Sequence, residues 1–221
     1  MIRQAGPRRE ERPEELAREF VDHWLGLSGE AWIALGGIDD VRHAFVEAAT
    51  AMAPQTSPGA RPRAVIWSTD DLAALDLPGL LTAHGYEFSM ATDHGDAGVG
   101  ASGLDETRVE RRIHAAAADL GITSCAWAAA DTGTIALYAT PSTGRLPSLL
   151  PTAHVALVRS SRLVRTITDG LALLAEYAAS QGGFPSAVNL ISGPSRTGDI
   201  EGDLAVGVHG PMRAGVIIGD W

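Results

Sequence analysis

The chain of 221 residues contains no lysine, so its 17 basic residues are all arginines. Schiff-base and pyridoxal-phosphate enzymes need a lysine amine, and the P-loop needs a lysine at the phosphates, so these classes are excluded. Cysteine is nearly as scarce, because Cys125 is the single one. One thiol cannot form an internal disulfide, a cysteine-ligated iron–sulfur cluster or a zinc ribbon. We therefore expect no metal and no cofactor in this chain.

Positive charge and long apolar runs are also in short supply. The 17 basic residues face 27 acidic ones, which gives a net charge of −10. Nucleic acids and anionic membranes attract cationic surfaces, so we expect neither as a partner. No apolar run approaches the roughly 18 residues of a membrane span, and residues 1–16 lack the apolar centre of a secretory signal. These absences predict a cytoplasmic protein.

The composition that remains is that of an ordinary globular protein, with 45% hydrophobic and 20% charged residues. Residues 1–12 form a charged segment bounded by proline, which we expect to be a mobile tail. Residues 13–221 then form a single α/β domain, and its part from 13 to 53 is helical. Apolar residues at helical spacing predict two helices there, one beginning at Pro13 and one at Ile38.

Short apolar strands alternate with helices in the rest of the chain, which is typical of a parallel sheet. The strands are expected at residues 64–68, 86–90, 154–159, 188–192 and 214–219. The helices are expected after residue 69, at 104–121 with Gly121 as the C-terminal cap, and at 163–180. Two further apolar strands around Asp131 form a hairpin. The fold class is therefore α/β, a mostly parallel sheet with helices on both faces and an inserted β-hairpin.

The densest group of polar and charged residues is ISGPSRTGDIEGD, residues 191–203. It begins where an apolar strand ends, the position at which open α/β sheets place their ligands. A helix start would explain Ser195, Thr197 and Asp199 as a cap and first turn, but it leaves Arg196 at the positive end of that helix unexplained. We predict that Gly193, Ser195, Arg196, Thr197 and Asp199 bind a small monoanion, a carboxylate or phosphate. The alternative is that Asp199 and Glu201 bond Arg196 and make it structural.

Two other segments offer reactive side chains. Asp131, Thr132 and Gly133 form the tip of the hairpin, where Asp and Gly also suit a tight turn. The apolar flanks suggest that Asp131 is partly buried and needs a partner, with Arg145 and Arg196 as candidates. His209 lies between glycines in GVHGP, either near a ligand together with Gly210 or in an ordinary turn. The histidine spacings predict no metal site.

Two other features suggest a function less strongly. GVGASG, residues 98–103, matches the dinucleotide-binding pattern, but a polar stretch separates it from the nearest strand, so we interpret it as a surface loop. Cys125 lies in an apolar run without a neighbouring base, so we expect Cys125→Ser to preserve function.

The C-terminal half resembles the LUD-domain family, of the lactate-utilisation protein C type. The resemblance is carried, in order, by GITSCAWAAADTGTIALYA, RLPSLLPTAHVALV and ISGPSRTGDIEGDLAVGVHGP. The family is expected to carry a glutamate before the hairpin Thr-Gly, where this chain has Asp131, a carboxylate shorter by one methylene.

The resemblance implies a NagB/RpiA/CoA transferase-like fold. It also implies a part in oxidising L-lactate to pyruvate alongside iron–sulfur partner proteins, which would carry the electrons. In this interpretation Asp131, Glu201 and His209 are the candidate catalytic residues, and the residues that bind the substrate or anion are Thr132, Gly133, Gly193, Ser195, Arg196, Thr197, Asp199 and Gly210. The alternative is a stand-alone enzyme of the isomerase, transferase or cyclo-ligase type that acts on a phosphorylated or nucleotide-bearing substrate.

Overall fold

The computed structural model describes residues 12–52, 60–91, 112–140, 143–198, 204–207 and 209–221. It begins with two helices, α1 (Pro13–Gly26) and α2 (Ile38–Met52), as the apolar spacing predicts. A strand that the sequence analysis did not predict, β1 (Glu30–Ala34), lies between them. The N-terminal part is therefore not purely helical, because it also contributes an edge strand to the main sheet.

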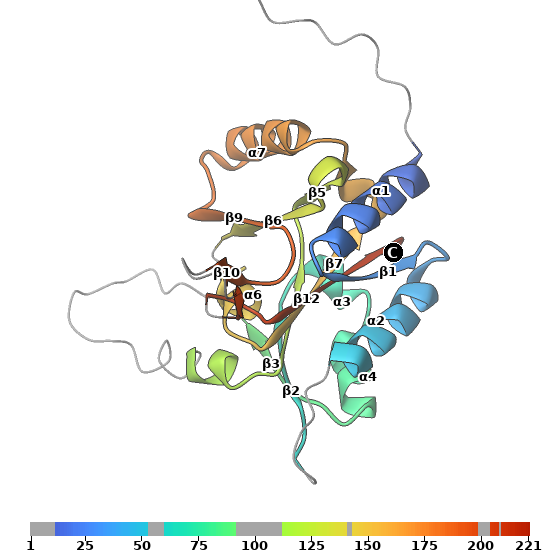
Figure 1. Ribbon diagram of the computed structural model, residues 1–221, viewed down its shortest axis with the longest axis vertical. Helices are drawn as coiled ribbons and strands as arrows, with labels where there is room; N and C mark the ends of the chain where they lie inside the picture. The colour runs from blue at the N-terminus through green and yellow to red at the C-terminus, as the bar shows by residue number, and fades with distance from the viewer. Residues whose placement is uncertain (1–11, 53–59, 92–111, 141–142, 199–203, 208) are drawn as a thin grey trace, which may run out of the picture.

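The main sheet has six strands, all parallel, in the order β1-β12-β7-β4-β2-β3 (Figure 1). The five besides β1 are β2 (Arg63–Trp67), β3 (Glu87–Ala91), β4 (Leu120–Ser124), β7 (Ala153–Arg159) and β12 (Arg213–Gly219). Strands β12 and β7, the second and third in this order, are almost entirely buried, which explains their continuous apolar sequences.

Helices cover both faces of this sheet. Gly121 of β4 lies against α6 (Leu146–Leu149), because an added Cβ would stand 1.7 Å from the Pro147 carbonyl oxygen. Gly121 pairs with His154 of β7, and Gly215 of β12 pairs with the next residue, Val155. An added Cβ on Gly215 would lie 2.7 Å from Met52 of α2. Since successive residues of a strand point to opposite faces, α2 and α6 lie on opposite sides of the sheet. The fold class is thus confirmed.

The predicted hairpin belongs to a second sheet of four strands, ordered β8-β5-β6-β9. These strands are β5 (Trp127–Ala129), β6 (Thr134–Ala139), β8 (Leu163–Val164) and β9 (Ala187–Ile191). Strands β5 and β6 are antiparallel, as predicted, and helix α7 (Ile167–Gln181) packs on their outer side (Figure 1). Ala128, Ile135 and Leu137 point inward and share one hydrophobic core with the main sheet. The inserted hairpin is therefore the centre of a second layer.

Several predicted boundaries are wrong for a common reason. Gly121 does not cap a helix: helical structure ends at residue 116, and Gly121 lies inside β4 because only a residue without a side chain fits beneath Pro147. The helix predicted from 163 begins at Ile167, since Leu163 pairs in β8. The helix expected after residue 69 is two short ones, α3 (Asp70–Ala73) and α4 (Leu77–Ala83). For Gly121 and Leu163, tertiary contacts override local preference. Asp76, in a left-handed conformation, caps α4 and separates it from α3.

Strand β9 is predicted correctly but belongs to a different sheet. It pairs antiparallel with β6 rather than extending the parallel sheet. The segment after it is not a helix start, because β10 (Arg196–Gly198) pairs antiparallel with β11 (Leu204–Val206). A helix start is therefore not the explanation of this segment. The expected position at the end of a strand of the parallel sheet is also wrong, because β9 belongs to the second sheet.

Candidate functional site

The tip of the β5–β6 hairpin is held in place by backbone contacts. Residues Ala130–Thr132 form one turn of 3₁₀ helix, and Gly133 follows with φ of 57°. A Cβ on Gly133 would stand 2.7 Å from the backbone nitrogen of Trp24, so the tip lies directly on α1. The Asp131 N–H donates to the Arg165 carbonyl oxygen at 3.0 Å. These contacts fix the backbone on both sides of the Asp131 side chain.

Three hydroxyl groups connect this tip to the end of β9. The Thr134 hydroxyl donates to Thr132 Oγ1 at 2.9 Å and lies 2.8 Å from Ser192 Oγ. Thr134 is buried, Thr132 is half-buried and Ser192 is exposed. The hydroxyls therefore connect the protein interior, at Thr134, with the surface, at Ser192. In the chain, Thr132 directly follows Asp131, and Ser192 directly precedes Gly193.

Asp131 has one carboxylate oxygen without a partner. Its Oδ1 is buried and makes no hydrogen bond among the described residues, although the residue as a whole is half-buried. The predicted partial burial is thus correct. Neither predicted arginine bonds this oxygen: Arg196 is exposed on β10, and Arg145 lies at the start of α6. An enclosed carboxylate oxygen without a donor costs free energy, so Asp131 stands ready to accept a hydrogen bond.

The structure brings the GPSR and GVHGP segments together, as their common assignment to one site requires. The Ser195 N–H donates to the Pro211 carbonyl at 3.0 Å, and Ser195 accepts from the Gly207 N–H at 3.0 Å. A Cβ on Gly210 would lie 3.3 Å from the Cβ of Ser195, so these two residues touch. Gly193 turns the chain with φ of 90° beneath Leu27, whose carbonyl leaves no room for a side chain.

The predicted site residues therefore fall into two adjoining groups. Asp131, Thr132 and Gly133 form the hairpin tip, and Gly193, Ser195, Arg196 and Gly210 form the neighbouring turn and strand, with exposed His209 beside them. Ser192 joins the two groups through Thr134. Asp199 and Glu201 lie outside the described residues, as does the GVGASG segment, and the side chain of Thr197 is not described either.

Sequence reasoning missed Thr134 and Ser192. Both stand beside a glycine that was singled out, Thr134 after Gly133 and Ser192 before Gly193. A hydroxyl next to a turn glycine at the end of a strand was the available signal. Their separation of 58 positions meant that only the β6–β9 pairing could show that they meet.

His154 and Cys125 are buried reactive groups outside this site. Burial lowers the pKa of His154 to about 4, and its Nε2 lies 2.9 Å from Thr123 Oγ1. Burial likewise raises the pKa of the Cys125 thiol to about 12. A thiol in that environment is a poor nucleophile, which supports the prediction that Cys125→Ser preserves function.

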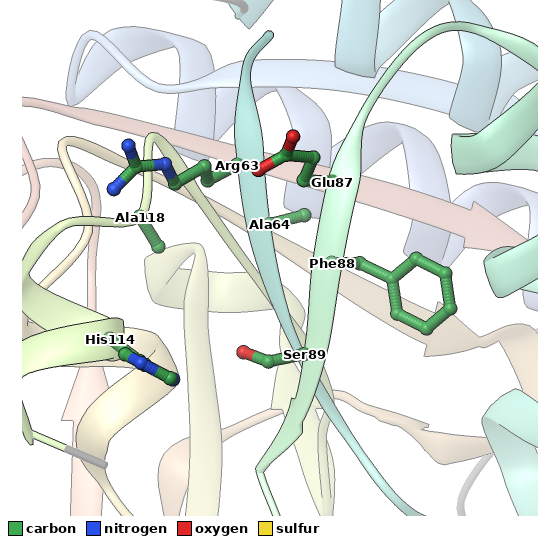
Figure 2. A pocket seen from close by; sticks show the side chains of 7 residues that line it. All are labelled: Arg63, Ala64, Glu87, Phe88, Ser89, His114 and Ala118. Carbon is green, nitrogen blue, oxygen red and sulfur yellow. The ribbon is translucent and has the colours of Figure 1, made fainter. Parts of the chain in front are cut away.

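A groove of about 350 Å³ lies elsewhere, on the face of β2 and β3 (Figure 2). Its polar lining comes from Arg63, Glu87, Ser89 and His114, and Ala64, Phe88 and Ala118 complete it. None of these residues belongs to the predicted site. The groove is therefore a separate feature beside the edge of the main sheet.

No group of three or more potential ligands for a metal ion occurs in the part of the chain that the structure describes. In the same part, no helix combines the length and the apolar character needed to cross a membrane.

Comparison with known proteins finds a solved structure similar over almost the whole chain and sequence relatives that match about half of it. A crystal structure of a DUF162 family protein from Deinococcus radiodurans superposes with a TM-score of 0.61, covering 95% of this chain and 99% of that one at 22% identity. Lactate utilization protein C of Halalkalibacterium halodurans is 44% identical over 115 residues, 52% of this chain and 50% of that protein. Lactate utilization protein C of Bacillus subtilis is 41% identical over 101 residues, 46% and 42% of the two chains.

The chain thus spans about half the length of the curated relatives it matches, at 50% and 42% for these two. The LUD domain family model matches residues 33–218, a range that includes both groups of predicted site residues. The resemblance seen in the sequence motifs is confirmed, and this chain belongs to the LUD domain family.

Proposed function

We propose that this chain is a component of a lactate-utilisation system, which oxidises L-lactate to pyruvate together with iron–sulfur partner proteins. Support comes from its membership of the LUD domain family and from relatives about 40% identical that carry the name Lactate utilization protein C. The observation that carries the site assignment is the unpartnered Asp131 oxygen in a hairpin tip where Thr132 and Thr134 follow it in the chain and Thr134 contacts the Ser192 hydroxyl.

This arrangement suits a small 2-hydroxy acid. The free Asp131 oxygen accepts a hydrogen bond, which the 2-hydroxyl group of lactate can donate. Ser192, directly after β9, and Arg196, at the start of β10, are both exposed and would supply a hydroxyl and a guanidinium for a carboxylate. Glu201 and His209 are the remaining proton-carrying residues that we assign to this site. In this proposal the chain binds and orients the substrate.

The electrons have to leave the site. Oxidation of lactate to pyruvate releases two electrons and two protons. The single cysteine of the chain is buried and cannot hold a cluster alone. The proposal therefore assigns electron transfer to partner proteins with iron–sulfur clusters.

Growth on L-lactate tests the role in the system. We expect deletion of the gene to abolish growth on L-lactate, and the native gene to restore it. Asp131→Asn should fail to restore growth. The amide puts an NH₂ donor in place of one carboxylate oxygen, and the oxygen that remains is uncharged. Asp22→Asn, an exposed carboxylate on α1, is the matched control and should restore growth. Normal growth of the deletion strain on L-lactate would contradict the proposal.

Ligand binding tests the site directly. L-lactate should raise the melting temperature of the purified protein, since a ligand that binds only the folded state stabilises it. Arg196→Gln should keep the melting temperature of the free protein and lose this rise, whereas Arg18→Gln, exposed on α1, should keep both. A full ligand-induced rise in Arg196→Gln would remove Arg196 from the site. Turnover of a phosphosugar, acyl-CoA or folate by the purified chain alone would instead favour the stand-alone enzyme.

A further inference from the structure

Strand β3 is one edge of the main sheet in the part of the chain that the structure describes, and half of its backbone groups point away from β2. Within the described residues β3 pairs with β2 alone. The Glu87 N–H donates to the Pro62 carbonyl at 2.9 Å, so Glu87, Ser89 and Ala91 direct their backbone groups towards β2. By alternation, the N–H and C=O groups of Phe88 and Met90 point outward. Four strong hydrogen-bonding groups thus stand in a row along this edge.

Among the described residues, this edge has no lysine, no proline and no bulge. Such edges are commonly protected by lysine, proline or a bulge. Strand β3 has the sequence EFSMA, with one charged residue at its first position, and pairs with β2 in continuous register. Its two large apolar side chains are exposed, Phe88 by 38% and Met90 by 41%. Figure 2 shows Phe88 pointing away from the face that carries Ser89.

We propose that a second copy of this chain pairs with β3 in an antiparallel manner, about a two-fold axis at Ser89, so that two main sheets become one. Directly opposed residues must both point their backbone groups across the seam or both point them away. This condition excludes every register that opposes Phe88 to Ser89. Of the registers that remain, the one centred on Ser89 pairs all five residues of β3.

In this register the side chains of the two strands are compatible. Phe88 lies opposite the partner's Met90 on one face, which is a favourable contact between sulfur and an aromatic ring. Ser89 lies opposite the partner's Ser89 on the other face. Because each residue of an antiparallel strand advances about 3.4 Å, Glu87 and the partner's Glu87 stand about 14 Å apart. That distance exceeds the Debye length of about 8 Å at physiological salt, so the only charge on the strand does not oppose pairing.

The pairing also determines where the groove of Figure 2 lies relative to the seam between the two copies. Glu87 and Ser89 point towards this groove, on the face of the sheet that α6 also covers. A two-fold axis perpendicular to the sheet keeps that face on the same side in both copies. The two grooves would therefore lie next to each other across the seam.

Cysteine cross-linking tests both the partner and the register. In a non-hydrogen-bonded antiparallel pair the Cα atoms are about 4.5 Å apart, within the range that a disulfide spans. Ser89→Cys should therefore form a disulfide-linked dimer on mild oxidation, with no contribution from buried Cys125. Phe88→Cys and Met90→Cys should each link poorly alone and link efficiently when mixed. Ser180→Cys, on the exposed side of α7, is the control for random collision.

The mass of the native protein in solution completes the test. We expect a dimer by light scattering, and we expect Met90→Lys to raise its dissociation constant at least tenfold while preserving the circular dichroism spectrum of the fold. A native protein that stays monomeric at every concentration overturns the proposal. So does a dimer that persists in Met90→Lys and in which Ser89→Cys links no faster than Ser180→Cys.

Discussion

At the scale of single residues, His154 connects the fold to pH. Its imidazole is buried in β7 against Thr123, and burial lowers its pKa from 6.5 to about 4. The folded protein therefore keeps this histidine neutral at pH values where the unfolded chain already binds a proton. Its contribution to stability is complete above pH 6.5 and is lost as the pH falls towards 4.

We expect His154→Gln to flatten this dependence. Between pH values of about 7 and 4, protonation of His154 on unfolding should lower the free energy of unfolding of the native protein by about 3 kcal/mol. The variant should lack this decrease. Urea denaturation at several pH values measures the difference, with exposed His84→Gln as the control. Equal slopes in the native protein and His154→Gln would show that the histidine is not neutral in the fold.

Gly121 shows how one residue fixes the distance between a strand and a helix. An added Cβ would lie 1.7 Å from the Pro147 carbonyl oxygen, which is backbone and cannot turn aside. Gly121→Ala should therefore destabilise the protein by about 3 kcal/mol or more, as overpacked cores do. Gly26→Ala, at the end of α1 with open space around it, should be neutral or slightly stabilising. Thermal unfolding of the two variants compares them.

At the scale of elements, the candidate site depends on how the hairpin tip lies on α1. The main-chain nitrogen of Trp24 stands 2.7 Å from the position of a Cβ on Gly133, and Gly133 has φ of 57°. The Arg165–Glu19 ion pair, at 2.8 Å, joins the same helix to the chain after β8. Helix α1 thus supports Asp131 from behind, although it contributes no predicted site residue.

Gly133→Ala should displace the tip from α1. A left-handed conformation costs a residue with a side chain about 1–2 kcal/mol, and the close contact with Trp24 adds to that cost. We expect a lower melting temperature together with loss of the rise induced by L-lactate, because Asp131 and Thr132 move with the tip. Gly182→Ala is the matched control: it shares a positive φ of 73° but has open space around it, so it should lower the melting temperature and keep the ligand effect. A Gly133→Ala variant that binds L-lactate normally would argue that the tip is not part of the site.

At the scale of the whole molecule, the two sheets share one hydrophobic core. Ile122 and Val155 of the main sheet belong to the same buried cluster as Ile135 and Leu137 of β6. A smaller cluster, with Trp127 and Tyr138, lies between the second sheet and α7, where the Trp127 indole donates to the Tyr138 hydroxyl at 2.9 Å. We propose on this basis that residues 13–221 form a single domain.

A single domain of this kind should unfold in one cooperative step. We expect far-ultraviolet circular dichroism, which reports both sheets, and tryptophan fluorescence to give coincident urea transitions. Trp127 reports the second layer and Trp24 reports α1, so Trp127→Phe and Trp24→Phe separate the two signals. Two resolved transitions would instead assign the second sheet and α7 to an independent unit.

The class of the fold follows from local patterns in the sequence. Continuous apolar runs such as those of β7 and β12 predict buried parallel strands, and the periodic apolar residues of α1 and α2 predict amphipathic helices. The Asp131-Thr132-Gly133 turn predicts the hairpin through the chemistry of the turn alone. The family resemblance likewise rests on contiguous motifs in the sequence.

Which segments meet depends on the arrangement of the chain in space. Gly121 looks like a helix cap in sequence and lies in a strand, since the reason for the glycine is a carbonyl 26 positions away. Strand β9 has the sequence of any apolar strand, and pairing with β6 assigns it to the second sheet. That same pairing brings Ser192 to Thr134, three residues after Asp131 and its unpartnered oxygen. Hydrogen bonds between segments distant in the chain depend on the position of both partners in space, and a local pattern records only one of them.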